Sequence, residues 1–299
     1  MSADWRTDFK KDYARILQER ASLAALSALG VGGEAEFFVE PDSLNEVCEI
    51  FRFGSVAGFP VYVLGGGTNV VFSDGTLNGV TLSARRLCGM SWDGELLVAE
   101  AGVPMPLIVS EAAKRRLAGV EFAYGIPGSL GGAVAGNAGA GGRGMSDVLE
   151  EVTTVERDGS VREWHNGEFS GSYRSFSLSA TGRLIAKCKI KFQNSSREDI
   201  ERETEIFKKA REGQPREGRS AGCTFKNPPG DSAGRLLDVA GCKGLRVGGA
   251  VVSGVHANFI INSGGASGMD IVELIGLCRD MVFQKTGISL ENEIKLLGF

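Results

Sequence analysis

Two stretches in the second half of the chain contain residue types suited to electrostatic or acid–base chemistry. Tyr173 and Arg174 follow an aromatic and glycine-containing segment, and a guanidinium offers a rigid fork of donors for a carboxylate, a phosphate or a developing enolate. In Ser220-Ala-Gly-Cys-Thr-Phe-Lys-Asn-Pro228, small residues leave the Cys223 thiol open to close approach as nucleophile, base or proton donor. The plain alternatives are a surface ion pair for Arg174 and an inert buried thiol for Cys223.

Acidic and imidazole side chains occur in the last part of the chain. Glu291 and Glu293 lie in Ile288–Leu297, a predicted strand that would place both carboxylates on one face. A carboxyl group buried in a pocket has a raised pKa and can act as a general acid; the alternative is two acids that face water. His256 and Asn258 form a further polar pair, just before a predicted strand.

Two glycine-rich stretches predict close contact between the backbone and a ligand. Tyr124–Arg143 is apolar and its only charged residue is Arg143, so we predict an ordered loop against a flat or phosphorylated group rather than a flexible hinge. Gly65-Gly-Gly-Thr-Asn69 separates two short apolar strands. Because no helix follows, a dinucleotide fingerprint is disfavoured. A nest of N–H groups for pyrophosphate is favoured over a tight turn.

Hydrophobic spacing indicates the elements that must position these residues. It predicts a helix over 7–19, another over 105–117, and helices that begin after the capping residues Ser43, Ser196 and Ser267. The composition changes near residue 195, where we predict a domain boundary.

Composition excludes several function classes. The formal net charge is −4 and no strongly basic block is present, so nucleic acid and anionic membrane surfaces are unlikely partners. No apolar run reaches the roughly 18 residues of a membrane span, and the first residues do not resemble a secretory signal, which predicts a cytoplasmic protein. Six scattered cysteines and two histidines predict no metal site.

In order along the chain, these motifs resemble the MurB-type UDP-N-acetylenolpyruvoylglucosamine reductases, flavoenzymes of peptidoglycan synthesis. The resemblance covers about residues 28–299, and the length of 299 residues resembles the shorter, type II form. The stretches that carry it are Leu64–Asn69, Tyr124–Ala133, Asn137–Gly139, Tyr173-Arg174, Gln214-Pro215, Ser220–Pro228, Gly248–Ala250 and Leu290–Ile294.

The resemblance implies an α+β protein whose FAD-binding fold is of the vanillyl-alcohol-oxidase (PCMH) type, followed by a C-terminal α+β substrate domain. It implies NADPH-dependent reduction of the enolpyruvyl double bond of UDP-N-acetylglucosamine enolpyruvate to UDP-N-acetylmuramate, for cell wall biogenesis and hence cell shape and division. It further implies a cytoplasmic, monomeric enzyme. The alternatives are another FAD oxidoreductase of the superfamily, such as an alcohol or hydroxy-acid oxidase, and a non-redox nucleotide-sugar binding module.

By motif position, the resemblance implies roles for individual residues. Arg174, Cys223 and Glu293 match the catalytic positions, with Cys223 at the proton donor, which is usually serine in this family. The implied FAD-binding residues are Leu64, Gly65, Gly66, Gly67, Thr68, Asn69, Gly125, Ile126, Pro127, Gly128, Gly131, Gly132, Asn137, Ala138 and Gly139. The implied substrate-binding residues are Tyr173, Arg211, Gln214, Lys226, Asn227 and His256. The implied domains are a helical extension over 1–27, an FAD-binding domain over 28–195 with two subdomains that divide near 85, and a substrate domain over 196–299.

Overall fold

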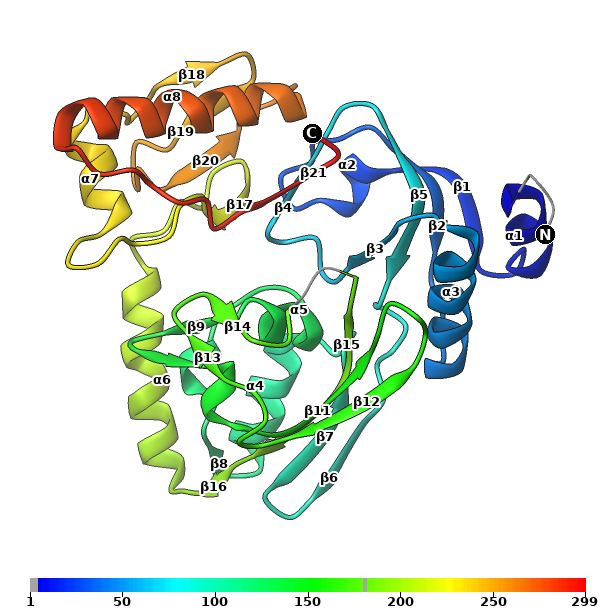
Figure 1. The fold of residues 1–299 in the computed structure, drawn as a ribbon. Coiled ribbons are helices and arrows are strands. Elements are labelled where there is room, and N and C mark those ends of the chain that lie inside the picture. Colours follow the sequence, from blue (N-terminus) through cyan, green and yellow to red (C-terminus); the bar gives the residue numbers. More distant parts are fainter. Residues whose placement is uncertain (1–4, 180–181) are drawn as a thin grey trace. The chain divides into compact units, whose positions relative to one another are not determined.

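The computed structural model describes residues 5–179 and 182–299. These residues form two compact units, each assembled from separate chain segments. Unit 1 comprises the described parts of 1–19, 36–66 and 78–211, and unit 2 comprises 20–35, 67–77 and 212–299. Figure 1 shows the course of the chain.

A five-stranded antiparallel sheet is the centre of the larger part of unit 1, with strand order β12-β11-β15-β7-β6. Helix α5 contacts β15 and β7, and together with α4 it encloses a core that includes Phe122, Leu130 and Phe192. The bounds are β6 Met90–Asp93, β7 Leu96–Glu100, α4 Met105–Lys114, α5 Leu130–Ala135, β11 Leu149–Val155, β12 Val161–His165 and β15 Leu184–Lys191.

Short elements complete this part of unit 1. Antiparallel pairs join β9 to β10, β13 to β14 and β8 to β16, and helix α6 follows. Ser196 accepts the Asp199 N–H at 3.0 Å, which confirms the predicted cap. The bounds are β8 Leu117–Ala118, β9 Gly139–Ala140, β10 Arg143–Gly144, β13 Gly171–Ser172, β14 Ser175–Phe176, β16 Gln193–Asn194 and α6 Arg197–Arg211, with 3-10 turns at Glu121–Ala123 and Met145–Asp147.

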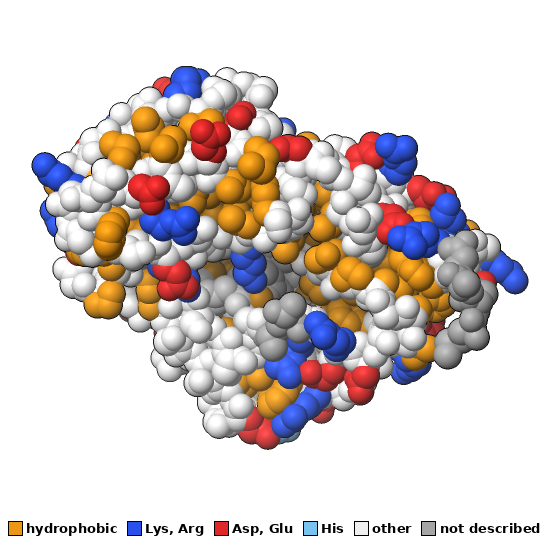
Figure 2. All heavy atoms as spheres, turned by 45° about the horizontal axis from the view of Figure 1, so that its top comes forward, with side chains coloured by type: hydrophobic (Ala, Val, Ile, Leu, Met, Phe, Trp, Pro, Cys, Tyr) orange, Lys and Arg blue, Asp and Glu red, His pale blue; other side chains and the backbone are white. Residues whose placement is uncertain are grey.

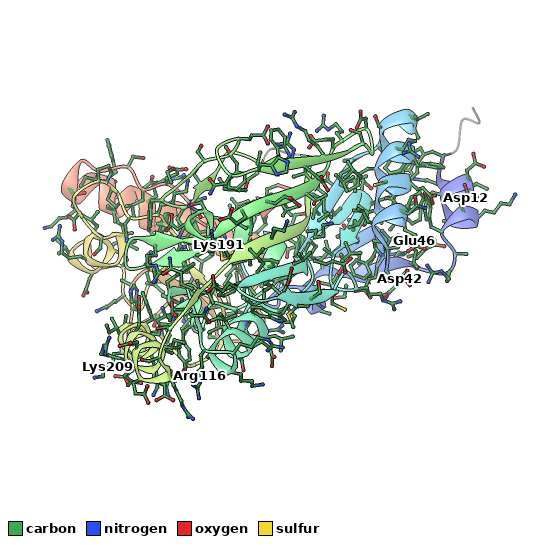
Figure 3. All side chains as sticks on the ribbon, turned by 90° about the horizontal axis from the view of Figure 1, so that it is seen from below. Asp12, Asp42, Glu46, Arg116, Lys191 and Lys209 are labelled. Carbon is green, nitrogen blue, oxygen red and sulfur yellow. The ribbon has the colours of Figure 1, made fainter. Side chains whose placement is uncertain are left out.

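A second sheet has the strand order β1-β2-β5-β3, and the division between the units falls within β1, β2 and β5. Ser43 accepts the Glu46 N–H at 3.2 Å, which confirms the predicted cap of α3. Asp42 and Glu46, both labelled in Figure 3, form ion pairs with Arg15. The bounds are α1 Trp5–Asp12, β1 Leu17–Ser22, α2 Leu23–Leu26, β2 Glu34–Val39, α3 Leu44–Ala57, β3 Val61–Leu64 and β5 Thr76–Ser83.

In unit 2, a four-stranded antiparallel sheet of order β17-β20-β19-β18 packs against α8, which also contacts α7. Ser267 and Asp270 form the predicted capping box of α8. The last strand, β21, lies parallel to β4. The bounds are β4 Val70–Phe72, β17 Arg219–Cys223, α7 Ala233–Val239, β18 Arg246–Val247, β19 Ala250–Val252, β20 Phe259–Asn262, α8 Gly268–Thr286 and β21 Lys295–Leu297.

Four predictions about secondary structure were wrong in part. The helix predicted over 105–117 ends at Lys114, and Leu117 begins strand β8. The helix predicted over 7–19 ends at Asp12, and Leu17 begins a strand, although its apolar residues all pack in one core as expected. The prediction was wrong because these apolar residues recur at the spacing of one continuous helix, although they belong to a helix, to the turn after it and to the strand that follows. The glycine stretch 124–143 is ordered but contains helix α5. The strand predicted over 288–297 is confined to Lys295–Leu297, because the residues before it pair with a different partner.

Charged side chains do not segregate on the face drawn in Figure 2, where acidic and basic groups are interspersed. That face has no extended basic surface of the kind that nucleic acids bind. Over the described residues, no helix is long and apolar enough to cross a membrane.

Candidate active site

The two glycine stretches predicted to bind a cofactor meet within unit 1. A Cβ atom on Gly66 would lie 2.7 Å from Gly128 Cα, and one on Gly65 would lie 2.9 Å from Ser129 Oγ. Both distances are shorter than ordinary van der Waals contact. At Gly66 the neighbour is backbone, so only glycine permits this approach, whereas at Gly65 the neighbour is a side-chain hydroxyl. The structure thus brings together residues that are some 60 positions apart and forms a single surface that is mostly backbone.

Ser129, in the second of these stretches, is a candidate that sequence reasoning missed. It is 5% exposed, and its Oγ has no hydrogen-bond partner among the described residues. A buried hydroxyl without a partner is costly, whereas a phosphate oxygen or another cofactor acceptor would satisfy it. The serine was visible in the Gly-Ser-Leu-Gly-Gly motif, but nothing in the sequence distinguished it from a helix cap. Together with the glycine surface, this orphaned hydroxyl makes the residues present fit an FAD.

Unit 2 contains the rest of the triple-glycine turn. Gly67 has a φ of +68°, and its Cβ would lie 1.9 Å from the Leu26 carbonyl oxygen. Its own carbonyl accepts the Ala28 N–H at 2.9 Å. Asn69 donates from Nδ2 to the Glu293 carbonyl at 3.1 Å. The predicted phosphate turn is therefore tied directly to the segment that carries a predicted catalytic carboxylate.

Arg174 lies at the turn of the β13–β14 hairpin with a φ of +53°. Its Nη1 donates to the Gly139 carbonyl at 3.4 Å, and its guanidinium lies 5.7 Å from the centroid of the Tyr173 ring. Asn137 donates from Nδ2 to the Ser172 carbonyl at 2.8 Å, which fastens the hairpin to the glycine stretch. Two predicted cofactor residues, Asn137 and Gly139, thus help to position the predicted catalytic arginine.

Cys223 ends β17 beside a register shift, opposite Phe259 of β20. The next residue, Thr224, accepts the Glu293 N–H at 2.8 Å. The structure therefore brings Cys223 and Glu293 onto neighbouring segments of unit 2. Glu291, two residues before Glu293, has an exposed side chain that forms an ion pair with Lys226.

The predicted substrate-binding residues occupy both units. In unit 1, Arg211 ends α6 and its side chain lies against Gly125, whose Cβ would be 2.9 Å from Arg211 Cδ. In unit 2, Asn227 Oδ1 accepts the Ala233 N–H at 2.9 Å and so caps α7. Gln214 lies in the segment between α6 and β17 and is half-buried.

His256 of unit 2 is half-buried, and burial lowers the pKa of its imidazole below the ordinary value, with Lys243 contributing in the same direction. Its Nδ1 accepts the Asn258 N–H at 3.2 Å, which requires the neutral ring with its proton on Nε2. The Nε2–H is thus the donor that His256 can offer to a ligand.

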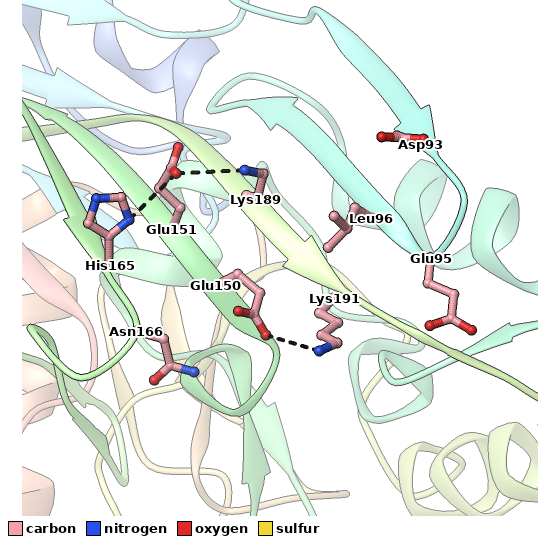
Figure 4. Close-up of a pocket in the computed structure, with 9 residues that line it drawn as sticks. All are labelled: Asp93, Glu95, Leu96, Glu150, Glu151, His165, Asn166, Lys189 and Lys191. Atoms are coloured by element: carbon pink, nitrogen blue, oxygen red, sulfur yellow. Dashed lines mark ion pairs between the residues drawn. The ribbon is translucent and has the colours of Figure 1, made fainter.

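A hollow of about 670 Å³ lies elsewhere, on the open face of the five-stranded sheet. Figure 4 shows ion pairs there between Glu151 and both His165 and Lys189, and between Glu150 and Lys191. No predicted site residue lines it; the lining residues are Asp93, Glu95, Leu96, Glu150, Glu151, His165, Asn166, Lys189 and Lys191. Within 5–179 and 182–299, no cluster of His, Cys, Asp and Glu could hold a metal ion.

Comparison with known families matches both halves of the chain. Residues 214–297 match the C-terminal domain of UDP-N-acetylenolpyruvoylglucosamine reductase, and residues 35–164 match an FAD-binding domain. The reductase of that name from Rubrobacter xylanophilus is 40% identical over 278 residues, covering 92% of this chain and 93% of its own length. The one from Chloroherpeton thalassium is 38% identical over 306 residues, covering 99% of this chain and 97% of its own.

Solved structures agree with these matches. The crystal structure of UDP-N-acetylenolpyruvylglucosamine reductase (MurB) from Thermus caldophilus superposes with a TM-score of 0.82 at 35% identity, covering 94% of this chain and 99% of that one. Phl p 4, a glucose dehydrogenase, shares the fold with a TM-score of 0.50 at 13% identity, over 65% of this chain and 44% of its own. The predicted α+β architecture with an FAD-binding fold of the PCMH type is confirmed.

Proposed function

Because the chain belongs to the UDP-N-acetylenolpyruvoylglucosamine reductase family, we propose that it reduces UDP-N-acetylglucosamine enolpyruvate to UDP-N-acetylmuramate with NADPH as reductant. Near-complete coverage at 40% identity carries this assignment. The reaction adds a hydride and a proton across the enol ether C=C bond and oxidises NADPH to NADP⁺. The family matches favour it over the alternatives of an alcohol oxidase or a non-redox binding module.

FAD, when bound, supplies the hydride that it has received from NADPH. We assign its binding to the residues predicted from the sequence and add Ser129, whose buried hydroxyl lies against Gly65 and has no partner in the part of the chain that the structure describes. The support is steric and polar together: glycines remove side chains where a ring and a pyrophosphate need room, and Ser129 offers a donor there.

Arg174 binds the carboxylate of the enolpyruvyl group in this proposal. As the hydride arrives at the distal carbon, negative charge develops at the carbon next to that carboxylate. The guanidinium fork stabilises this charge, so it stabilises the transition state more than the ground state. Its placement supports the role, because Arg174 itself binds the Gly139 carbonyl and Asn137 fastens the hairpin that carries the arginine.

Cys223 donates the proton to that carbon, and Glu293, as a protonated acid, shares the stabilisation of the charge. A thiol, with an ordinary pKa of about 8.5, is a stronger acid than the serine hydroxyl usual at this position in the family. The pairing of Thr224 with Glu293 supports a joint role. Tyr173, Arg211, Gln214, Lys226, Asn227 and His256 are proposed to bind the nucleotide sugar.

Both substrates are small, highly charged nucleotides that do not cross membranes unaided, so we propose that the enzyme works in the cytoplasm, and as a monomer. We also propose that residues 28–195 bind FAD and that 196–299 bind the sugar nucleotide, after an N-terminal extension over 1–27. The match of 214–297 to the family's C-terminal domain supports the second assignment.

Anaerobic half-reactions test the function directly. The purified protein should be yellow, NADPH should bleach its absorbance, and the enolpyruvyl nucleotide sugar should restore it within the turnover time. A simple alcohol or hydroxy acid should not restore it. Reduction by NADPH without reoxidation by the nucleotide sugar would reject the assignment.

A further inference from the structure

Asn258 is a buried amide that lies between the predicted catalytic segments of unit 2. We propose that it is a positioning residue, whose side chain holds the segment carrying Cys223 and Lys226 in register with the segment carrying Glu293. The proposal rests on the function proposed above. It concerns how the proton donor and the carboxylate are fixed, since no role has been assigned to Asn258 so far.

Both polar atoms of the Asn258 side chain bind the backbone of one residue. Oδ1 accepts the Phe225 N–H at 2.9 Å, and Nδ2 donates to the Phe225 carbonyl at 2.8 Å. Asn258 is 2% exposed and Phe225 is 1% exposed, so water cannot substitute for either bond. Turning the amide over would set donor against donor and acceptor against acceptor, which leaves one orientation.

These two hydrogen bonds take the place of those that a neighbouring strand would form with the Phe225 backbone. Strand β17 pairs with β20 up to Cys223 opposite Phe259, and the Thr224 N–H donates to the Asn258 carbonyl at 2.8 Å. β20 starts at Phe259, so past Thr224 the chain has no strand beside it on that side. The Asn258 amide has the donor and acceptor of a peptide group and satisfies Phe225 in its place.

On its other side, the same segment pairs with residues 291–293. The Glu293 N–H donates to the Thr224 carbonyl, and the Lys226 N–H donates to the Glu291 carbonyl, both at 2.8 Å. Residues 224–226, which we call the central segment, are thus hydrogen-bonded to the Asn258 amide on one side and to residues 291–293 on the other. A displacement of Phe225 would move Cys223, Lys226 and Glu293 relative to one another.

The turn that presents Asn258 is itself fixed by side chains. Ser253 Oγ accepts the Val255 and His256 N–H groups at 3.1 and 3.3 Å, and His256 Nδ1 accepts the Asn258 N–H at 3.2 Å. The amide is therefore oriented before any substrate binds. Such preorganisation matters because a misplacement of about 1 Å can cost roughly 100-fold in rate.

Two substitutions separate positioning from general stability. Asn258→Leu removes both bonds at similar volume, and Asn258→Asp keeps an acceptor for the Phe225 N–H but removes the donor. The control is Asn262→Asp at the opposite end of β20, where Nδ2 donates to the Leu29 carbonyl at 2.9 Å. In the FAD-loaded enzyme, reoxidation by the enolpyruvyl substrate should slow by about 10- to 100-fold in both Asn258 variants. Reduction by NADPH should stay within about twofold, and in the control both steps should stay within about twofold of wild type.

A second readout does not depend on turnover. The rate of iodoacetamide labelling at Cys223, followed by peptide mass spectrometry, should change at least about threefold in the Asn258 variants as the thiol moves. The exposed Cys88 of unit 1 is an internal standard whose rate should not change. This measurement also works if the wild-type enzyme does not accept the sugar nucleotide, so the proposed function can fail while Asn258 is still tested.

Two results would overturn the proposal. One is wild-type reoxidation and wild-type labelling of Cys223 in Asn258→Leu or, should that variant not fold, in Asn258→Asp. The other is an equal slowing of both half-reactions in the Asn258 variants and in the Asn262 control, which would make Asn258 a purely structural residue.

Discussion

The glycine surface of unit 1 and the central segment of unit 2 (residues 224–226) each fix the position of a backbone stretch, but they do so in opposite ways. Around Gly66 and Gly128, side chains are absent so that two backbone stretches can touch. Around Phe225, a side chain is present so that a backbone stretch without a strand partner is still hydrogen-bonded. An added side chain should therefore disturb the first region by steric clash. In the second region, a substitution should act by removing hydrogen bonds.

The largest expected effect is at the thiol of Cys223, which directly precedes the central segment. Cys223→Ala should lower kcat by roughly 10²- to 10⁴-fold, because it removes the proton donor, while Cys223→Ser restores a donor and should recover most of the rate. Steady-state oxidation of NADPH measures both. Alkylation of Cys223 should likewise inactivate the enzyme, with substrate protecting it. Full turnover after stoichiometric labelling of Cys223 would remove the thiol from the mechanism.

A smaller effect is expected from one added methyl group in the glycine surface. Gly66→Ala forces a contact with the Gly128 backbone, so FAD should dissociate at least about tenfold more readily and thermal stability should fall by about 1–3 kcal/mol. Gly142→Ala is the matched control, since Gly142 has a φ of +81° but nothing within 4 Å of its Cβ. It tests backbone strain alone, about 1 kcal/mol. Equal FAD retention in the two variants would mean that contact between the stretches is unimportant.

The smallest expected effect is on the pH dependence of folding stability, through His256 in the turn before Asn258. Burial lowers the pKa of His256 in the folded protein, whereas the unfolded value is about 6.5. The unfolded chain therefore binds more protons below that pH, so stability is complete above about pH 6.5 and declines as the pH falls through the folded pKa. Urea unfolding between pH 7.5 and 5 should show the decline, and His256→Asn should reduce it. An unchanged pH dependence in that variant would contradict the assignment.

The sequence revealed the motifs better than it revealed their partners. Glycine spacing and the Arg174, Cys223 and Glu293 positions were visible because each motif is local. The hydrogen bonds between Asn258 and Phe225 were not, since they join residues far apart whose pairing depends on where β20 begins. The strand predicted over 288–297 was too long for the same reason: residues 291–293 bind the segment around Phe225, and only Lys295–Leu297 continue as a strand.

The pairing of β21 with β4 has a consequence for the order in which the chain folds. Asn69 binds the carbonyl of Glu293, which is 224 positions later in the sequence, and Val70–Phe72 lie parallel to Lys295–Leu297. The phosphate turn therefore gains its neighbouring strand only when the chain closes a very long loop. Closing so long a loop is slow, so we expect this pairing to form late in folding.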